Sequence, residues 1–207
     1  MAWRLALLAA SSVDPVVRLR LTAVVCHFFM CRRAKDVLRL TAADISFPAD
    51  GGVAFQITRS KTDARKPGGV RLAHVYPAST FSTVADLPVL LLQHAVPSHL
   101  THSPPTCRLF SAPAADPGGV LTAWLRAGLR LLDVTAPVGT VYASHSCRGG
   151  GCTAMRTVGL GLDAIAQWAG MAIETLTSSY NDALAQVSPE AHFFFGRLLP
   201  RALDLPA

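Results

Sequence analysis

HSCRGGG, residues 145–151, begins a segment that ends with TSSYND, residues 177–182. This segment contains the most informative motifs of the chain, and the other segments are interpreted in relation to it. If the segment begins as a helix, His145 and Arg148 share a face, because positions i and i+3 are neighbours on a helix surface. An imidazole and a guanidinium can then point at one target. Tyr180 follows Arg148 by thirty-two positions. A phenol has a reference pKa of about 10, so it needs cationic neighbours to act as a nucleophile.

The composition is that of a folded, basic protein. The chain has 207 residues, of which 51% are hydrophobic and 15% charged, which suits one sizeable core and excludes a disordered tail. We therefore expect a single domain over residues 1–207. The net charge of +6 and the pI of about 9.4 favour an anionic partner, nucleic acid above all, although a merely solvated basic surface has the same charge. No apolar run approaches the roughly 20 residues that span a bilayer, so no membrane partner is expected.

The cysteines indicate a reducing compartment. They number five, an odd count without the spacing of a disulfide framework, which favours nuclear or cytoplasmic residence. Cys26, His27 and Cys31 invite a zinc interpretation, as do Cys147 and Cys152, but neither cluster has the paired ligand spacing of a structural zinc site. We expect no metal and no cofactor. Residues 1–10 are apolar with one early arginine, as in a short signal peptide, but the thiols argue against secretion.

Hydrophobic spacing predicts helices in the first two thirds of the chain. Residues 16–30 are dense in Val, Leu and Phe and are expected to form a buried helix, with a second helix over residues 32–40. Residues 86–95 and 120–134 also have helical spacing. The Pro-, Ser- and Thr-rich residues 97–119 between them are predicted to form a surface loop.

Two short strands complete the expected fold. Residues 53–57 alternate with a period of two, and residues 70–76 are a second candidate strand. Residues 59–69 between them are expected to form a basic hairpin tip that contains Lys61 and Lys66. The pattern therefore predicts a mainly α (α+β) domain with a small antiparallel β-sheet or hairpin.

The C-terminal segment is a candidate for assembly. A helix predicted over residues 190–199 contains three consecutive phenylalanines at 193–195, too apolar to remain exposed. It is expected to pack on its own core or on a neighbouring subunit, so residues 184–207 are assigned to oligomerisation. The same helix would be the docking element if the chain were instead a small helical interaction protein.

Arg33, Lys61, His145, Arg148 and Tyr180 resemble, in type and order, the active-site residues of the tyrosine recombinases, the phage-integrase family of site-specific DNA recombinases. In that family the first Arg begins a helix that is followed by Asp-Ile, similar to RAKDVLRL at residues 33–40 and DI at residues 44–45. The family Lys lies in a hairpin, often as Ser-Lys-Thr, which is residues 60–62 here. The resemblance extends over about 150 residues.

The spacing of the second box strengthens the resemblance. The family has a Leu-Gly-His or an equivalent twenty-three residues after the Arg and its nucleophilic Tyr nine residues later. Met171 and Tyr180 occupy these two positions, with Gly170 just before Met171. The HSCRGGG motif is also similar to that of recombinases from eukaryotic retroelements of the DIRS type. Several independent motifs at the expected distances are more specific than any one of them.

The resemblance implies site-specific recombination or integration of double-stranded DNA through a 3′-phosphotyrosyl intermediate, with self-association on DNA. Arg33 and Arg148 would stabilise charge on the nonbridging phosphate oxygens. Tyr180 would attack phosphorus, Lys61 would protonate the departing 5′ oxygen, and His145 would help to move the Tyr proton. This chemistry requires neither a metal nor an external energy source.

Departures from the family pattern leave a second interpretation open. Met171 replaces the usual His or Trp and loses a hydrogen bond to the phosphate, and Asp36 replaces a Glu that supports the first Arg. Fewer than 35 residues precede Arg33, so the family's N-terminal core-binding domain is expected to be absent. The alternative is a decayed mobile-element remnant that acts only as a DNA-binding module.

Each candidate residue also has an ordinary structural explanation. Arg33 would lie on a solvated helix face, and Lys61 in a basic loop tip where Lys66 is an alternative to it. His145 would cap a helix or lie in the core, and Tyr180 would be a packed tyrosine. Only the joint spacing favours the recombinase interpretation.

Overall fold

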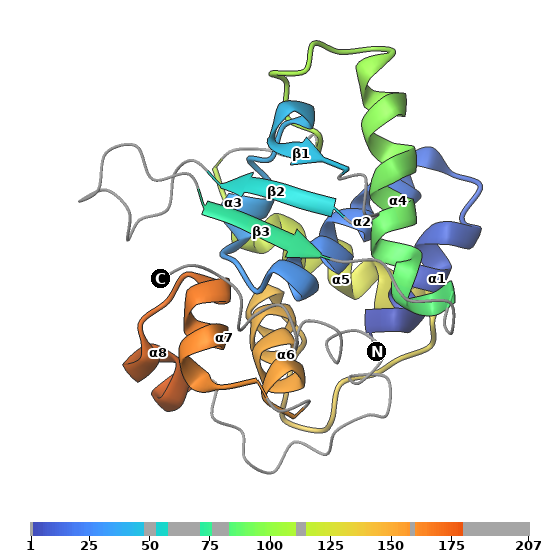
Figure 1. Cartoon of the computed structure of the whole chain (residues 1–207). Helices are drawn as coiled ribbons and strands as arrows, with labels where there is room; N and C mark the ends of the chain where they lie inside the picture. Colours follow the sequence, from blue (N-terminus) through green and yellow to red (C-terminus); the bar gives the residue numbers. More distant parts are fainter. Residues whose placement is uncertain are drawn as a thin grey trace.

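The structure, a computed structural model, describes residues 2–47, 53–57, 71–75, 83–110, 115–157 and 160–179. This part of the chain is mainly helical with one small antiparallel sheet (Figure 1), which confirms the predicted fold class. The elements in order are α1 (Ala2–Ser11), α2 (Pro15–Met30), α3 (Ala34–Val37), the 3₁₀ turn η1 (Ala42–Asp44), β1 (Ile45–Ser46), β2 (Val53–Ile57), β3 (Arg71–Val75), α4 (Thr83–Leu100), α5 (Pro117–Leu131), α6 (Ser144–Thr157), α7 (Leu162–Ala169) and α8 (Ile173–Ser179).

Helix α2 lies at the centre of the fold and contacts α1, α4, α5 and α6. Its start is fixed by Asp14, whose carboxylate accepts hydrogen bonds from the backbone N–H groups of Val16 and Val17, and by a proline at the first helical position. The helix ends at Cys31, which adopts a left-handed conformation with φ of 49°. The predicted buried helix over residues 16–30 is therefore confirmed.

Helix α6 approaches the end of α2 closely because glycines face it. A Cβ atom at Gly151 would collide with the carbonyl oxygen of Phe28 and the sulfur of Cys31, whereas one at Gly150 would lie 3.2 Å from the edge of the Phe28 ring. The run of glycines after Arg148 thus lets two helix backbones approach without a side chain between them. This approach brings the first turn of α6 near the residues that follow α2.

The sheet has the strand order β1-β2-β3, with both pairs antiparallel. Strands β2 and β3 confirm the two predicted strands at residues 53–57 and 70–76, and Phe55 pairs with Ala73. The two-residue strand β1 was not predicted. Val53 and Phe55 of β2 are buried in the same core as α2. The hairpin tip over residues 59–69 lies outside the described residues.

Some predicted boundaries are wrong. The helix expected over residues 32–40 is reduced to α3, because Arg33 has an extended backbone (φ −67°, ψ 148°) and turn geometry follows α3. The predicted loop over residues 97–119 is too long at both ends. Helix α4 runs through Pro97 to Leu100, and its buried Leu92 and Val96 stabilise it despite the missing proline donor.

The first helix, α1, was not predicted, and its buried Leu5, Ala6 and Ala9 pack on α2. At the other end, the predicted helix over residues 190–199 lies outside the described residues. Among the helices that the structure describes, none is long and apolar enough to cross a membrane.

Candidate functional site

Arg33 reaches the site from the junction between α2 and α3. It is the residue that precedes the first turn of α3, where its carbonyl oxygen accepts the Asp36 N–H at 2.8 Å. Its side chain is half-buried, and within the described residues its Nη1 is shielded from solvent without a hydrogen-bond partner. A buried guanidinium nitrogen of this kind can be satisfied by an incoming anion.

His145 and Arg148 reach the same site from the first turn of α6. The helix begins at Ser144, whose N–H donates to the Thr122 hydroxyl at 2.9 Å and so ties the start of α6 to α5. His145 is exposed, whereas Arg148, one turn later, retains only 6% of its accessible surface. Both side chains line one pocket, which confirms the prediction that the i and i+3 positions share a face.

The pocket, called here the arginine pocket, combines residues that are more than a hundred positions apart in the sequence. Its volume is about 390 Å³, and its lining residues are His27, Arg33, Ala34, Lys35, Pro117, Gly118, Ser144, His145 and Arg148. No carboxylate is among the described residues that line it. The first residues of α5 and α6 also line it, and helix N-termini have a partial positive charge. The pocket is therefore suited to an anion.

His27 contributes an uncharged imidazole to the pocket. Burial lowers its pKa to about 4, a hydrogen bond with the Arg32 backbone partly opposes this, and the positive charges of Arg148 and His145 lower it further. All three side chains line the same pocket. His27 thus adds no positive charge to the pocket at neutral pH.

Asp36 lies behind the pocket on α3 and is buried. Desolvation raises the pKa of its carboxyl, while the charges of Lys35, Arg33 and Arg32 and a hydrogen bond from the Arg33 backbone act in the opposite direction. The carboxylate in the position of the family Glu is therefore close enough to interact with Arg33.

Arg148 also holds the end of helix α7. Its Nη2 donates to the carbonyl of Ala169 at 3.2 Å, and Nη2 of the adjacent buried Arg32 donates to the carbonyl of Gln167 at 3.4 Å. Cations at a helix C-terminus are stabilised by its partial negative charge. The helix ends at Gly170, which has φ of 60° and on which a Cβ would collide with the Arg32 guanidinium.

The structure describes three of the five predicted site residues, Arg33, His145 and Arg148, and brings them together. Lys61 and Tyr180 lie outside the described residues. Met171 is half-buried against the hydrophobic core and is absent from the described residues that line the arginine pocket.

Two residues of the pocket, His27 and Lys35, were not predicted as site residues. His27 was considered only as part of a zinc cluster with Cys26 and Cys31, and Lys35 only as a residue of the helix predicted over 32–40. A signal existed for Lys35, because a basic residue lies two positions from the predicted catalytic Arg33. For His27 the sequence contained no signal for this pocket, because α2 also contains the buried polar Thr22, which does not line it.

All five cysteines lie in the described residues and have free thiols, as predicted. Cys31 and Cys152 lie close enough for a thiol–thiol hydrogen bond, and both are buried. In the described part of the chain, no group of three or more His, Cys, Asp or Glu side chains is arranged to hold a metal ion.

Comparison of the sequence with protein-family models and with curated proteins found no match.

Proposed function

We propose that the chain is a tyrosine-recombinase-type catalytic domain that cleaves and religates DNA strands. The observation that supports this most is the shared pocket of Arg33, His145 and Arg148, which come from two separate sequence motifs. A basic surface alone would leave its arginines solvated, whereas Arg148 is buried at the pocket. Burial of a guanidinium costs free energy, which contacts such as the hydrogen bond to the Ala169 carbonyl offset, so Arg148 is held at the pocket in a fixed position.

The proposed reaction begins when a DNA phosphodiester enters the arginine pocket. Arg33, just before α3, and Arg148 from α6 bind its nonbridging oxygens, and Lys35 adds a further positive charge. As phosphorus becomes five-coordinate, negative charge grows on these oxygens, and fixed donors stabilise it more than they stabilise the ground state. The pocket would therefore lower the barrier rather than only bind DNA.

The covalent step in this proposal uses Tyr180. Its phenolic oxygen attacks phosphorus, the bond from phosphorus to the 5′ oxygen breaks, and a 3′-phosphotyrosyl bond forms. Lys61 gives a proton to the leaving 5′ oxygen, and His145 accepts the phenol proton or relays it. Attack by the 5′ hydroxyl of another strand reverses these steps and releases Tyr180. Because bond energy is conserved at each step, no energy source is needed.

Formation of a covalent protein–DNA adduct tests this proposal. The substrate is nicked duplex DNA from the ends of the chain's own genomic element, in which loss of a short 5′-hydroxyl strand traps the adduct. We expect an SDS-resistant adduct with the unaltered chain and none with Tyr180→Phe. Arg33→Gln should slow adduct formation by about 10²–10³-fold, the usual effect of removing one transition-state donor.

Arg20→Gln is the matched control for Arg33→Gln. Arg20 is exposed on α2 and lies over the Trp124 ring, outside the arginine pocket, so its loss changes net charge equally without altering the site. Salt-dependent DNA binding without any adduct would contradict the catalytic proposal and support the decayed, binding-only interpretation. An adduct that persists in Tyr180→Phe would exclude Tyr180 as the nucleophile.

A further inference from the structure

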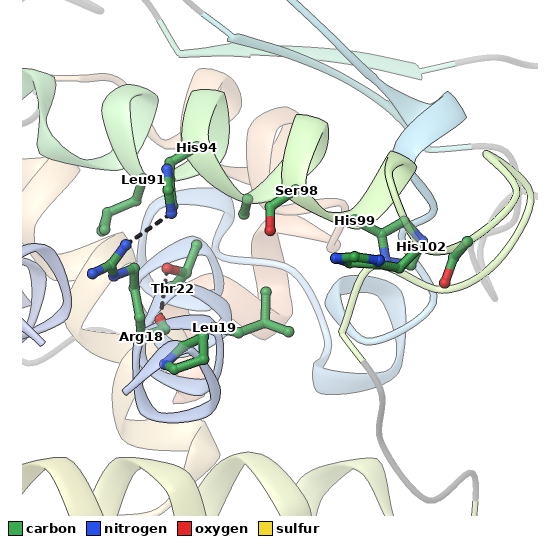
Figure 2. Close-up of a pocket in the computed structure, with 11 residues that line it drawn as sticks. Arg18, Leu19, Thr22, Leu91, His94, Ser98, His99 and His102 are labelled. Atoms are coloured by element: carbon green, nitrogen blue, oxygen red, sulfur yellow. Dashed lines mark hydrogen bonds between the residues drawn. The ribbon is translucent and has the colours of Figure 1, made fainter. Parts of the chain in front are cut away.

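A second basic pocket lies between helices α2 and α4, and its residues play no part in the proposed reaction (Figure 2). This pocket, called here the histidine pocket, has a volume of about 200 Å³. Its polar or charged lining residues are Arg18, Thr22, His94, Ser98, His99, His102 and Ser103. No Asp or Glu is among the described residues that line it. Such a lining is selective for anions.

One end of the histidine pocket is a contact between an arginine and a histidine. Arg18 Nη1 and His94 Nε2 are 2.8 Å apart (Figure 2). A guanidinium has no acceptor, so the imidazole nitrogen must accept and His94 is neutral in this arrangement. Arg18 Nε and Nη2 both donate to the Ser12 carbonyl, which fixes the guanidinium in place. The cation is thus held at the pocket before any ligand arrives.

The other end contains two further imidazoles. His99 and His102 lie side by side near the C-terminal end of α4 (Figure 2). Ser98 lies between this pair of histidines and His94 along the pocket. Within the described residues, His99 Nε2 is shielded from solvent and has no hydrogen-bond partner. A buried polar atom without a partner is costly, and a ligand that binds it removes that cost.

An anion fits these groups better than a metal ion does. Neutral imidazoles bind metals, but His94 Nε2 already accepts from Arg18, and a metal at that nitrogen would lie next to a fixed guanidinium charge. An anion has the opposite preference, because it can accept from Arg18 and from protonated imidazoles together. The Ser98 hydroxyl is a further donor, whereas the Thr22 hydroxyl already donates to the Arg18 carbonyl at 2.8 Å.

Proton uptake at His94 should accompany anion binding. Protonation removes the acceptor from Nε2, which breaks the contact with Arg18 and leaves two cations side by side unless an anion lies between them. The other charged or titratable groups on the elements that contact α4 have contacts elsewhere. Arg4 donates to the Leu132 carbonyl, Arg20 lies over Trp124, His27 lines the arginine pocket, and Asp44 accepts from Thr41. His99 and His102 are the other imidazoles that line the pocket.

We propose that the histidine pocket binds the tetrahedral dianionic group of a small molecule, a phosphate or sulfate ester, together with a proton. The bound dianion lies between Arg18 and His94 and reaches the donors toward His99. By linkage, the ligand raises the proton affinity of His94 by the same factor by which the proton raises ligand affinity. Binding is consequently tighter at lower pH.

Titration with inorganic sulfate tests the site directly, because the charge of sulfate is constant where histidine titrates. The full chain is titrated at fixed ionic strength, with chloride as the balancing anion, and the ring ¹H–¹⁵N signals of each histidine are followed. We expect saturable shifts at His94 and His99, with affinity at about pH 6 at least about threefold higher than at about pH 8. His145 reports the arginine pocket separately, so the two sites are distinguished.

Ser98→Asp and Gln93→Glu form a matched pair. Both place one negative charge on an exposed position of α4, but Ser98 lines the histidine pocket and Gln93 does not. Ser98→Asp should weaken sulfate binding at His94 by about tenfold or more, whereas Gln93→Glu should change it by less than about twofold. His94→Gln should abolish the pH dependence while weaker binding remains.

Three results would overturn the proposal. Sulfate shifts confined to His145, or binding that Ser98→Asp leaves intact, would show that the histidine pocket does not hold the anion. A third arm uses duplex DNA in place of sulfate. If DNA shifts His94 and Ser98→Asp weakens DNA binding as strongly as sulfate binding, the pocket belongs to a DNA-binding face and takes no small molecule.

Discussion

Gly151→Ala should destabilise the protein because no space exists for a methyl group between α6 and α2. The added Cβ collides with the Phe28 carbonyl oxygen and the Cys31 sulfur, and a backbone atom cannot rotate away. Forcing a group into a packed core costs about 1–3 kcal/mol, and alanine in place of glycine inside a helix returns about 1 kcal/mol. The collision with backbone places the cost in the upper part of that range. A net loss of about 1–2 kcal/mol is therefore expected.

Gly150→Ala is the matched control on the same helix. It has the same gain in helix propensity, but its Cβ meets only the edge of the Phe28 ring at 3.2 Å, and a ring can shift by a few tenths of an ångström. The stability of this variant should lie between that of the unaltered chain and about 1 kcal/mol above it.

Urea unfolding followed by circular dichroism measures the difference between the two alanine variants. We expect Gly151→Ala to be the less stable by about 2 kcal/mol, with a melting temperature lower by about 4–8 °C, because each kcal/mol shifts the melting temperature by about 2–4 °C at this chain length. Equal stability of the two variants would refute the close approach of α6 to α2. The position of His145 and Arg148 relative to Arg33 would then also be in doubt.

Two further predictions concern buried titratable groups. Burial lowers the pKa of His27 to about 4, below the usual value of 6.5 for the unfolded chain, so between these values only the unfolded state gains the proton. Stability should therefore fall by on the order of 3 kcal/mol as pH drops from about 6.5 to about 4, and urea unfolding of His27→Gln should lack this component. Cys107 is exposed and the other four cysteines are buried, so one thiol should react rapidly with a thiol reagent in the native protein and all five in denaturant. Cys107→Ser should abolish the rapid reaction, and a second fast thiol would contradict the burial.

The sequence predicts the site where local periodicity and motif spacing determine it. His145 and Arg148 share a face because α6 is a regular helix from Ser144 onward. Arg33 was chosen over the adjacent Arg32 from its motif, and the structure separates the two residues as that choice requires. Arg33 lines the arginine pocket, while Arg32 is buried against Gly170 and Gln167.

The sequence does not predict contacts that depend on how helices end or cross. Lys35 reaches the arginine pocket because α2 stops at Cys31 in a left-handed conformation and α3 is only one turn long, so the regular helix expected there does not form. Arg18 and His94 are 76 positions apart and meet only through the packing of α2 on α4. Neither periodicity nor a local motif contains that information.

Arg32 and Arg148 are both buried, and capping of the C-terminal end of α7 explains one of them better than the other. Arg32 is fully buried, donates to a carbonyl at the end of α7 and is absent from the described pocket lining, so helix capping is a sufficient reason for it. Arg148 donates to the same helix end, yet it also lines the pocket. Capping does not require Arg33, Lys35 and His145 to converge beside it. The convergence of Arg33, Lys35 and Arg148 without a lining carboxylate among the described residues is unfavourable in an empty pocket, and a bound anion removes that penalty.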